Sequence, residues 1–111
     1  MIIASRILKF QNRESEIDVQ IDIHMPQLDE SDWICHYEIH WPDGKQANFA
    51  KGFDSVQALH LGMQRICLDL YMSKYHTTGN LYWDKPGSGY GFPITPNGRS
   101  FLVGDDKIFE G

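Results

Sequence analysis

Three side chains at alternate positions are the first candidates for chemistry. His36, Glu38 and His40 alternate with apolar residues, and this pattern predicts a strand with one solvent-facing side. Side chains on one side of a strand lie about 6.6 Å apart, so His36 and His40 are about 13 Å apart. One metal ion, with bonds to histidine nitrogen of about 2.1 Å, cannot easily reach both. An adjacent pair such as His36 and Glu38 could still hold an ion, with help from Asp22 or His24.

The preceding strand offers a structural explanation for the same side chains. Residues 17–24 also alternate, and they predict a second strand with one polar face. If the apolar faces of the two strands match, His36 lies opposite Asp22 and His40 lies opposite Asp18. Cross-strand pairs of imidazole and carboxylate groups stabilise a sheet surface without any metal. The pattern therefore leaves two interpretations open, a metal site or a set of cross-strand pairs.

The remaining reactive groups form no catalytic set. Cys35 and Cys67 fall on apolar, core-facing positions, where a thiol is inert. The glycine-rich run at residues 87–91 lacks the lysine and the following helix of a phosphate-binding loop. No serine lies in a Gly-x-Ser-x-Gly turn. We therefore expect neither a catalytic residue nor a cofactor, and we favour a protein that is not an enzyme.

Acidic residues are concentrated in one part of the chain. The 111 residues carry a formal net charge of -5, and residues 14–44 contain nine acidic residues with no Lys or Arg. This stretch repels phosphates, which argues against a nucleic-acid partner. It attracts a basic protein surface instead. The residues predicted to bind such a partner are Asp18, Asp22, Asp29, Glu30, Asp32 and Glu38.

The N-terminal half of the chain is predicted to form four strands. The first three cover residues 2–10, 17–24 and 33–41, with a loop at 26–32. Residues 42–44, Pro-Asp-Gly, suit a three-residue hairpin loop. The fourth strand then continues the core face with Ala47 and Phe49.

The hydrophobic period changes after Asp54. Asp54 and Gln57 have the spacing of a helix cap, so we predict a helix from about Ser55 to Lys74, ended by Thr77–Gly79. Its apolar residues form two nearly opposite stripes, so one packs on the sheet and the other needs a second cover. We favour the C-terminal segment over a second copy of the chain as that cover. The stripes are Leu59, Met63, Ile66 and Leu70, and Leu61, Leu68 and Met72.

These elements predict a single α+β domain over residues 1–111. It is an antiparallel four-stranded meander with one long helix packed on one face, followed by loops and short strands at Leu81–Asp84 and near Ser100–Val103. The longest apolar run is Met1–Ala4, which predicts no membrane span and no signal peptide. With two cysteines taken as reduced, we expect a cytoplasmic protein, either a monomer or a homodimer.

Four short runs carry a family resemblance. They are WICHYEI at 33–39, GFDSVQAL at 52–59, LYW at 81–83 and GFP at 91–93. With these runs the chain resembles a family of small uncharacterised bacterial proteins, catalogued only as a domain of unknown function. The resemblance covers most of the chain and implies a bacterial, cytosolic origin. It implies no activity and no site residue.

Two functions follow as hypotheses. The first is a non-enzymatic protein-interaction module, of the immunity or inhibitor type, that uses the acidic hairpin region to cover a basic partner. The alternative is a small metal- or ligand-binding protein, or a hydrolase, that uses the strand face of His36, Glu38 and His40.

Overall fold

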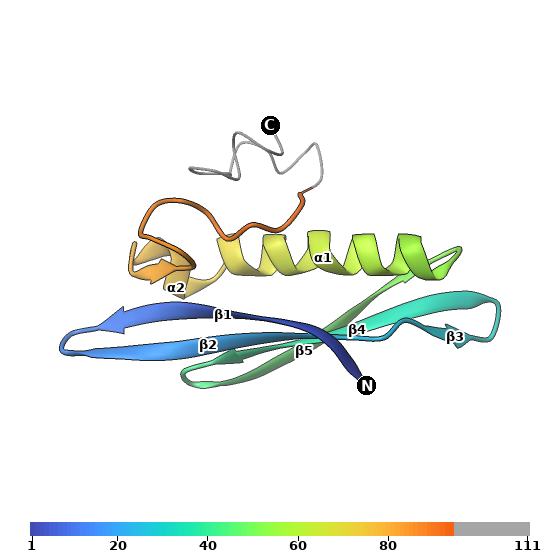
Figure 1. Ribbon diagram of the computed structural model, residues 1–111, viewed down its shortest axis with the longest axis horizontal. Helices are drawn as coiled ribbons and strands as arrows, with labels where there is room; N and C mark the ends of the chain where they lie inside the picture. The colour runs from blue at the N-terminus through green and yellow to red at the C-terminus, as the bar shows by residue number, and fades with distance from the viewer. Residues whose placement is uncertain (95–111) are drawn as a thin grey trace.

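A single main helix lies across one face of an antiparallel sheet. The computed structural model describes residues 1–94. Figure 1 shows α1 over the sheet, and the segment after β6 passing over the side of α1 that faces away from the sheet. The predicted α+β class is therefore confirmed, while the strand expected near Ser100–Val103 lies outside the described residues. The elements are β1 (Ile2–Asn12), β2 (Ser15–His24), β3 (Gln27–Asp29), β4 (Asp32–Trp41), β5 (Gly44–Gly52), α1 (Ser55–Tyr71), α2 (Lys74–Thr77) and β6 (Leu81–Tyr82).

Over residues 1–94 the sheet has six strands, whereas the predicted meander has four. The long strands β1, β2, β4 and β5 are neighbours in that order, β3 also pairs with β4, and β6 pairs with β1. The predicted loop at residues 26–32 is wrong, because it contains strand β3. Glu30 adopts a left-handed conformation (φ 56°), and the resulting tight turn pairs Asp29 with Asp32. The short strand expected after Leu81 is confirmed as β6.

The register between β2 and β4 differs from the prediction by two residues. Asp22 lies opposite Glu38 instead of His36, and His40 lies opposite Gln20 instead of Asp18. The prediction assumed that β2 and β4 form a hairpin joined by the loop at residues 26–32. In the structure, β3 forms the hairpin with β4 instead. Because a shift of two residues preserves the side of each residue, the polar side chains stay on the predicted face.

The β4–β5 hairpin was predicted with a loop one residue too long. Trp41 pairs with Gly44, so the connection has two residues. A slip of one residue moves every side chain of a strand to the opposite face. Ala47 and Phe49, expected in the core, therefore lie on the face away from α1, opposite Glu38 and His36.

The helix begins as predicted and ends earlier. Asp54 caps it, with Oδ1 accepting a hydrogen bond from the backbone nitrogen of Gln57 at 2.7 Å. The predicted continuation to Lys74 was wrong, because α1 ends at Tyr71. Ser73 then caps the four-residue α2 by accepting a hydrogen bond from the backbone nitrogen of His76. Serine favours this capping position over a helix interior, and this preference explains the break.

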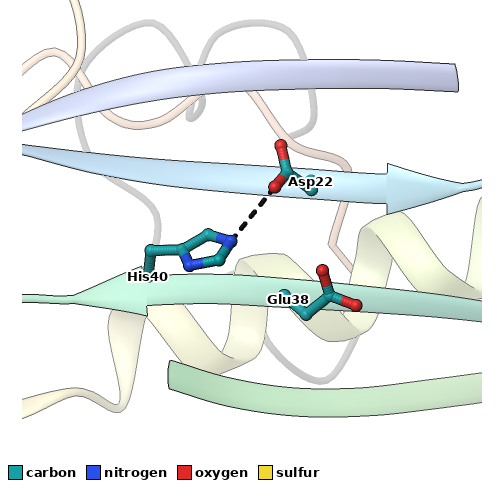
Figure 2. Close-up of side chains that lie close together, drawn as sticks. All are labelled: Asp22, Glu38 and His40. Atoms are coloured by element: carbon teal, nitrogen blue, oxygen red, sulfur yellow. Dashed lines mark hydrogen bonds and ion pairs between the residues drawn. The ribbon is translucent and has the colours of Figure 1, made fainter. Parts of the chain in front are cut away.

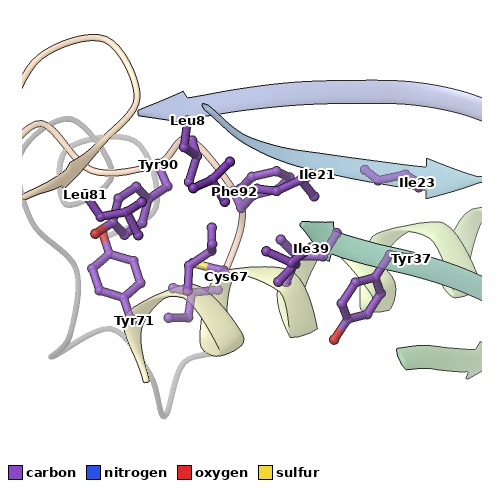
Figure 3. Close-up of a cluster of buried hydrophobic side chains, with 14 of the residues drawn as sticks. Leu8, Ile21, Ile23, Tyr37, Ile39, Cys67, Tyr71, Leu81, Tyr90 and Phe92 are labelled. Carbon is purple, nitrogen blue, oxygen red and sulfur yellow. The ribbon is translucent and has the colours of Figure 1, made fainter. Parts of the chain in front are cut away.

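The core lies between the sheet and α1 (Figure 3). Leu8, Ile21 and Ile39 from the sheet and Ile66 and Leu70 from α1 are fully buried. Both cysteine thiols are buried there too. The second stripe of α1 is less covered, because Leu61 and Leu68 are half-buried and Met72 is exposed.

The described part of the C-terminal segment folds back beside β1 and Met63 of the first stripe, so its predicted role as cover of the second stripe stays a prediction. Tyr90 and Phe92 are buried in the core. The guanidinium of Arg6 on β1 donates to the backbone oxygens of Tyr90 and Gly91, both at 3.0 Å. The same guanidinium lies 3.9 Å from the ring centroid of Trp83. These contacts attach the segment to the helix-facing side of β1.

Candidate metal centre

The face of the sheet opposite α1 holds the candidate site. Among the described residues, no helix covers this face (Figure 1). Its centre consists of polar residues from β2 and β4, because the alternate residues of these strands face α1. Its flanks are more apolar, with Ile7 on β1 and Phe49 on β5 both partly exposed.

Asp22 is the most buried polar residue of this face, with 4% of its surface exposed. Oδ1 accepts hydrogen bonds from Ser5 Oγ at 2.7 Å and from Gln20 Nε2 at 2.8 Å. Oδ2 lies 3.0 Å from Nε2 of His40 (Figure 2). Burial alone would raise the pKa of this carboxyl, but the three hydrogen bonds outweigh burial and lower its pKa. Asp22 is therefore an ionised carboxylate held in a fixed orientation.

Glu38 lies directly opposite Asp22 on the neighbouring strand. Like charges at directly opposite positions destabilise a sheet, so this pair needs a positive charge nearby. Glu38 Oε2 lies 2.7 Å from Nε2 of His24. That contact lacks hydrogen-bond geometry, and His24 Nε2 is shielded from solvent with no hydrogen-bond partner among the described residues. Glu38 is therefore the ion-pair partner of this nitrogen.

The side chains at the centre of this face are spaced for a metal ion. One ligating atom from each of Asp22, Glu38 and His40 lies within 4.8 Å of the other two. Ligand bonds to zinc measure about 2.0–2.2 Å, so two ligands on opposite sides of an ion are about 4 Å apart. Small side-chain rotations would therefore close the set on one ion. His24 Nε2, 2.7 Å from Glu38 Oε2, lies beside this set of three but is not part of it.

The predicted metal residues are only partly brought together. Glu38 and His40 lie in the cluster, whereas the His36 ring packs against the Phe49 ring with centroids 5.8 Å apart. Asp22, named from the sequence as a helper, is a member of the cluster, and His24, the other named helper, contacts Glu38. Ser5, which orients Asp22, carried no signal in the sequence.

The six acidic residues predicted to bind a partner do not form one surface. Asp22 and Glu38 belong to the metal-ligand cluster, and Asp18 forms an ion pair with Lys9. The other three lie at the β3–β4 turn, at one end of the sheet, and they are Asp29, Glu30 and Asp32.

A family model described as "Domain of unknown function (DUF6968)" matches residues 4–94. The chain belongs to this family. No curated protein and no solved structure matches the chain. Over the described residues, the helices are too short or too polar to cross a membrane. The family description assigns no site.

Proposed function

We propose that the protein binds a divalent first-row transition metal through Asp22, Glu38, His40 and His24. The observation that carries this proposal is the close approach of Asp22, Glu38 and His40, each of which places one ligating atom within 4.8 Å of the other two. His24 Nε2, 2.7 Å from Glu38 Oε2, is the further ligating atom beside them.

The charge of the cluster supports a dication. The opposed carboxylates of Asp22 and Glu38 carry two negative charges, and an ion with two positive charges neutralises both. Two imidazole nitrogens and two carboxylate oxygens suit Zn²⁺ and its neighbours in the first transition row. Ser5 and Gln20 act from outside the ligand set, because their hydrogen bonds to Oδ1 leave Oδ2 of Asp22 facing the cluster.

Titration calorimetry with ZnCl₂ on the tag-free full chain, stripped with chelator, tests the proposal. We expect one Zn²⁺ per chain. His40→Gln and His24→Gln should each weaken binding by at least about tenfold, the loss that even supporting residues of metal sites cause. His36→Gln is the matched control, since His36 is on the same side of β4 but packs against Phe49.

Thermal unfolding of the same variants separates a lost site from a lost fold. A ligand at a hundredfold excess over its Kd stabilises the folded state by about 2.7 kcal/mol. Zn²⁺ should therefore raise the Tm of the wild type and of His36→Gln, and leave the Tm of folded His40→Gln and His24→Gln almost unchanged. Equal shifts in all four proteins, or no shift in any, would contradict the proposal.

A further inference from the structure

Large apolar side chains are exposed where the β3–β4 turn meets the start of α1. Leu28, Phe53 and Val56 are 63%, 88% and 74% exposed. Phe53 precedes the helix cap, a position from which an apolar residue often packs against the fourth residue of the helix. That residue, Ala58, is already covered by Gly52, where an added Cβ would lie 2.5 Å from the Ala58 nitrogen. Phe53 therefore projects into solvent.

Strand pairing places these residues on adjoining elements. Leu28 pairs with Trp33, and Trp33 pairs with Gly52, so the ends of β3, β4 and β5 lie side by side. A cavity of about 290 Å³ opens there between the strand ends and the first turns of α1. Its lining residues are Asp32, Lys51, Gly52, Phe53, Gln57 and Leu61. We call this cavity, together with Leu28 and Val56, the hairpin-end surface.

The rim of the hairpin-end surface is acidic. Asp29, Glu30 and Asp32 surround the turn, and Lys51 is the cation beside them, with Nζ 3.9 Å from Asp29 Oδ2. Two other exposed carboxylates, Asp18 and Asp43, have closer cations. Asp18 pairs with Lys9, and Asp43 pairs with Lys74 at 2.8 Å. The excess of negative charge therefore coincides with the exposed apolar residues.

We propose that the hairpin-end surface docks a partner-protein segment in which Lys or Arg residues flank an apolar side chain. The apolar side chain enters the cavity beside Phe53, and the basic residues face Asp29, Glu30 and Asp32. Single exposed apolar residues are common on proteins and need no explanation. Here Phe53 lines a cavity, and Leu28 lies on the strand beside the acidic turn. Complementary charge with an apolar centre is the arrangement of a recognition site. This proposal is independent of the metal centre.

Selection from a phage-displayed library of random dodecapeptides, with the full chain as bait, tests the inference. The enriched peptides should combine basic and apolar residues, and added salt should weaken their binding. Phe53→Ser should weaken binding of the enriched peptides by at least about tenfold, as loss of a central aromatic anchor does. Met72→Ser is the matched control, because Met72 is also exposed but lies at the other end of α1.

Three results would overturn the proposal. The first is that no peptide is enriched, or that enriched peptides are acidic. The second is equal binding of the enriched peptides to the wild type and to Phe53→Ser. The third is self-association of the chain that Phe53→Ser abolishes, since it would assign this surface to a second copy.

Discussion

The two faces of the sheet consist of alternate residues of the same strands, yet they are held in different ways. On the face toward α1, Ile21 and Ile39 are fully buried by side chains of a second layer. On the opposite face, Asp22 is nearly as buried, although no described helix covers it. Its cover comes from polar neighbours in the sheet that hydrogen-bond to it. Packing of apolar side chains therefore stabilises the first face, whereas hydrogen bonds and ion pairs between polar side chains stabilise the second.

Truncating a core residue should have the largest effect on stability. Ile21→Ala removes methyl groups from a site with no exposed surface, and such changes destabilise proteins by about 2–5 kcal/mol. The neighbouring exposed Gln20 provides the matched change on the other face. Urea unfolding should show a smaller loss for Gln20→Ala, about 1 kcal/mol for its hydrogen bond to Asp22. Equal losses would remove the distinction between the two faces.

Removing the central carboxylate should have the next largest effect. Asp22→Ala leaves Ser5 and Gln20 without their shared acceptor, and a lost partner of this kind costs about 1–3 kcal/mol. The metal-free protein should therefore unfold at lower urea concentration. Asp18→Ala, on the same strand and face but exposed beside Lys9, should change stability much less. If Asp22→Ala left the free energy of unfolding unchanged, the hydrogen bonds to this carboxylate would contribute nothing to stability.

A polar group on the apolar face gives a smaller test. The hydroxyl of fully buried Tyr37 donates a hydrogen bond to Asp69 on α1, and burial, then this carboxylate, raise the pKa of Tyr37. Tyr37→Phe should destabilise the protein by about 1 kcal/mol, the usual net value of one hydrogen bond. A loss as large as that of Ile21→Ala would show that this face also depends on polar pairing.

The smallest effect we predict is a dependence of stability on pH. Hydrogen bonds hold the pKa of Asp22 in the folded state below the ordinary value of 3.8, so the unfolded chain takes up the proton first as the pH falls. The stabilisation by this carboxylate is complete above pH 3.8 and is lost as the pH falls through the lowered pKa. Asp22→Asn should flatten the acid side of the stability profile. An unchanged profile would show that Asp22 is not held as described.

Local patterns in the sequence predicted the fold class. The lengths of the turns determined the register of the strands and the face on which each side chain lies. Alternation over residues 17–24 and the cap at Asp54 depend on neighbouring residues alone, and both features are present in the structure. The face of Phe49 depended on whether the preceding turn has two residues or three. Pro-Asp-Gly favours three, whereas Trp41 pairs with Gly44 and leaves two. A one-residue error in that turn was enough to misplace the strand.

The sequence predicted which residue types lie on the polar face, but it did not predict which of those residues meet in the candidate site. The alternation placed imidazole and carboxylate groups on one face, as the structure shows. Which of them meet depends on the pairing of β2 with β4, and that register is set by the short β3 hairpin, which carries no strong periodic signal. His24 therefore contacts Glu38 of the cluster, and His36 stays beside Phe49.

A crystal of the full chain soaked in ZnCl₂, with anomalous diffraction collected at the zinc edge, tests the metal centre most directly. We predict one strong anomalous peak on the outer face of the sheet, about 2.0–2.2 Å from ligand atoms of Asp22, Glu38, His40 and His24. Zinc bound elsewhere, with His24 Nε2 hydrogen-bonded to Glu38 and no peak between β2 and β4, would contradict the account.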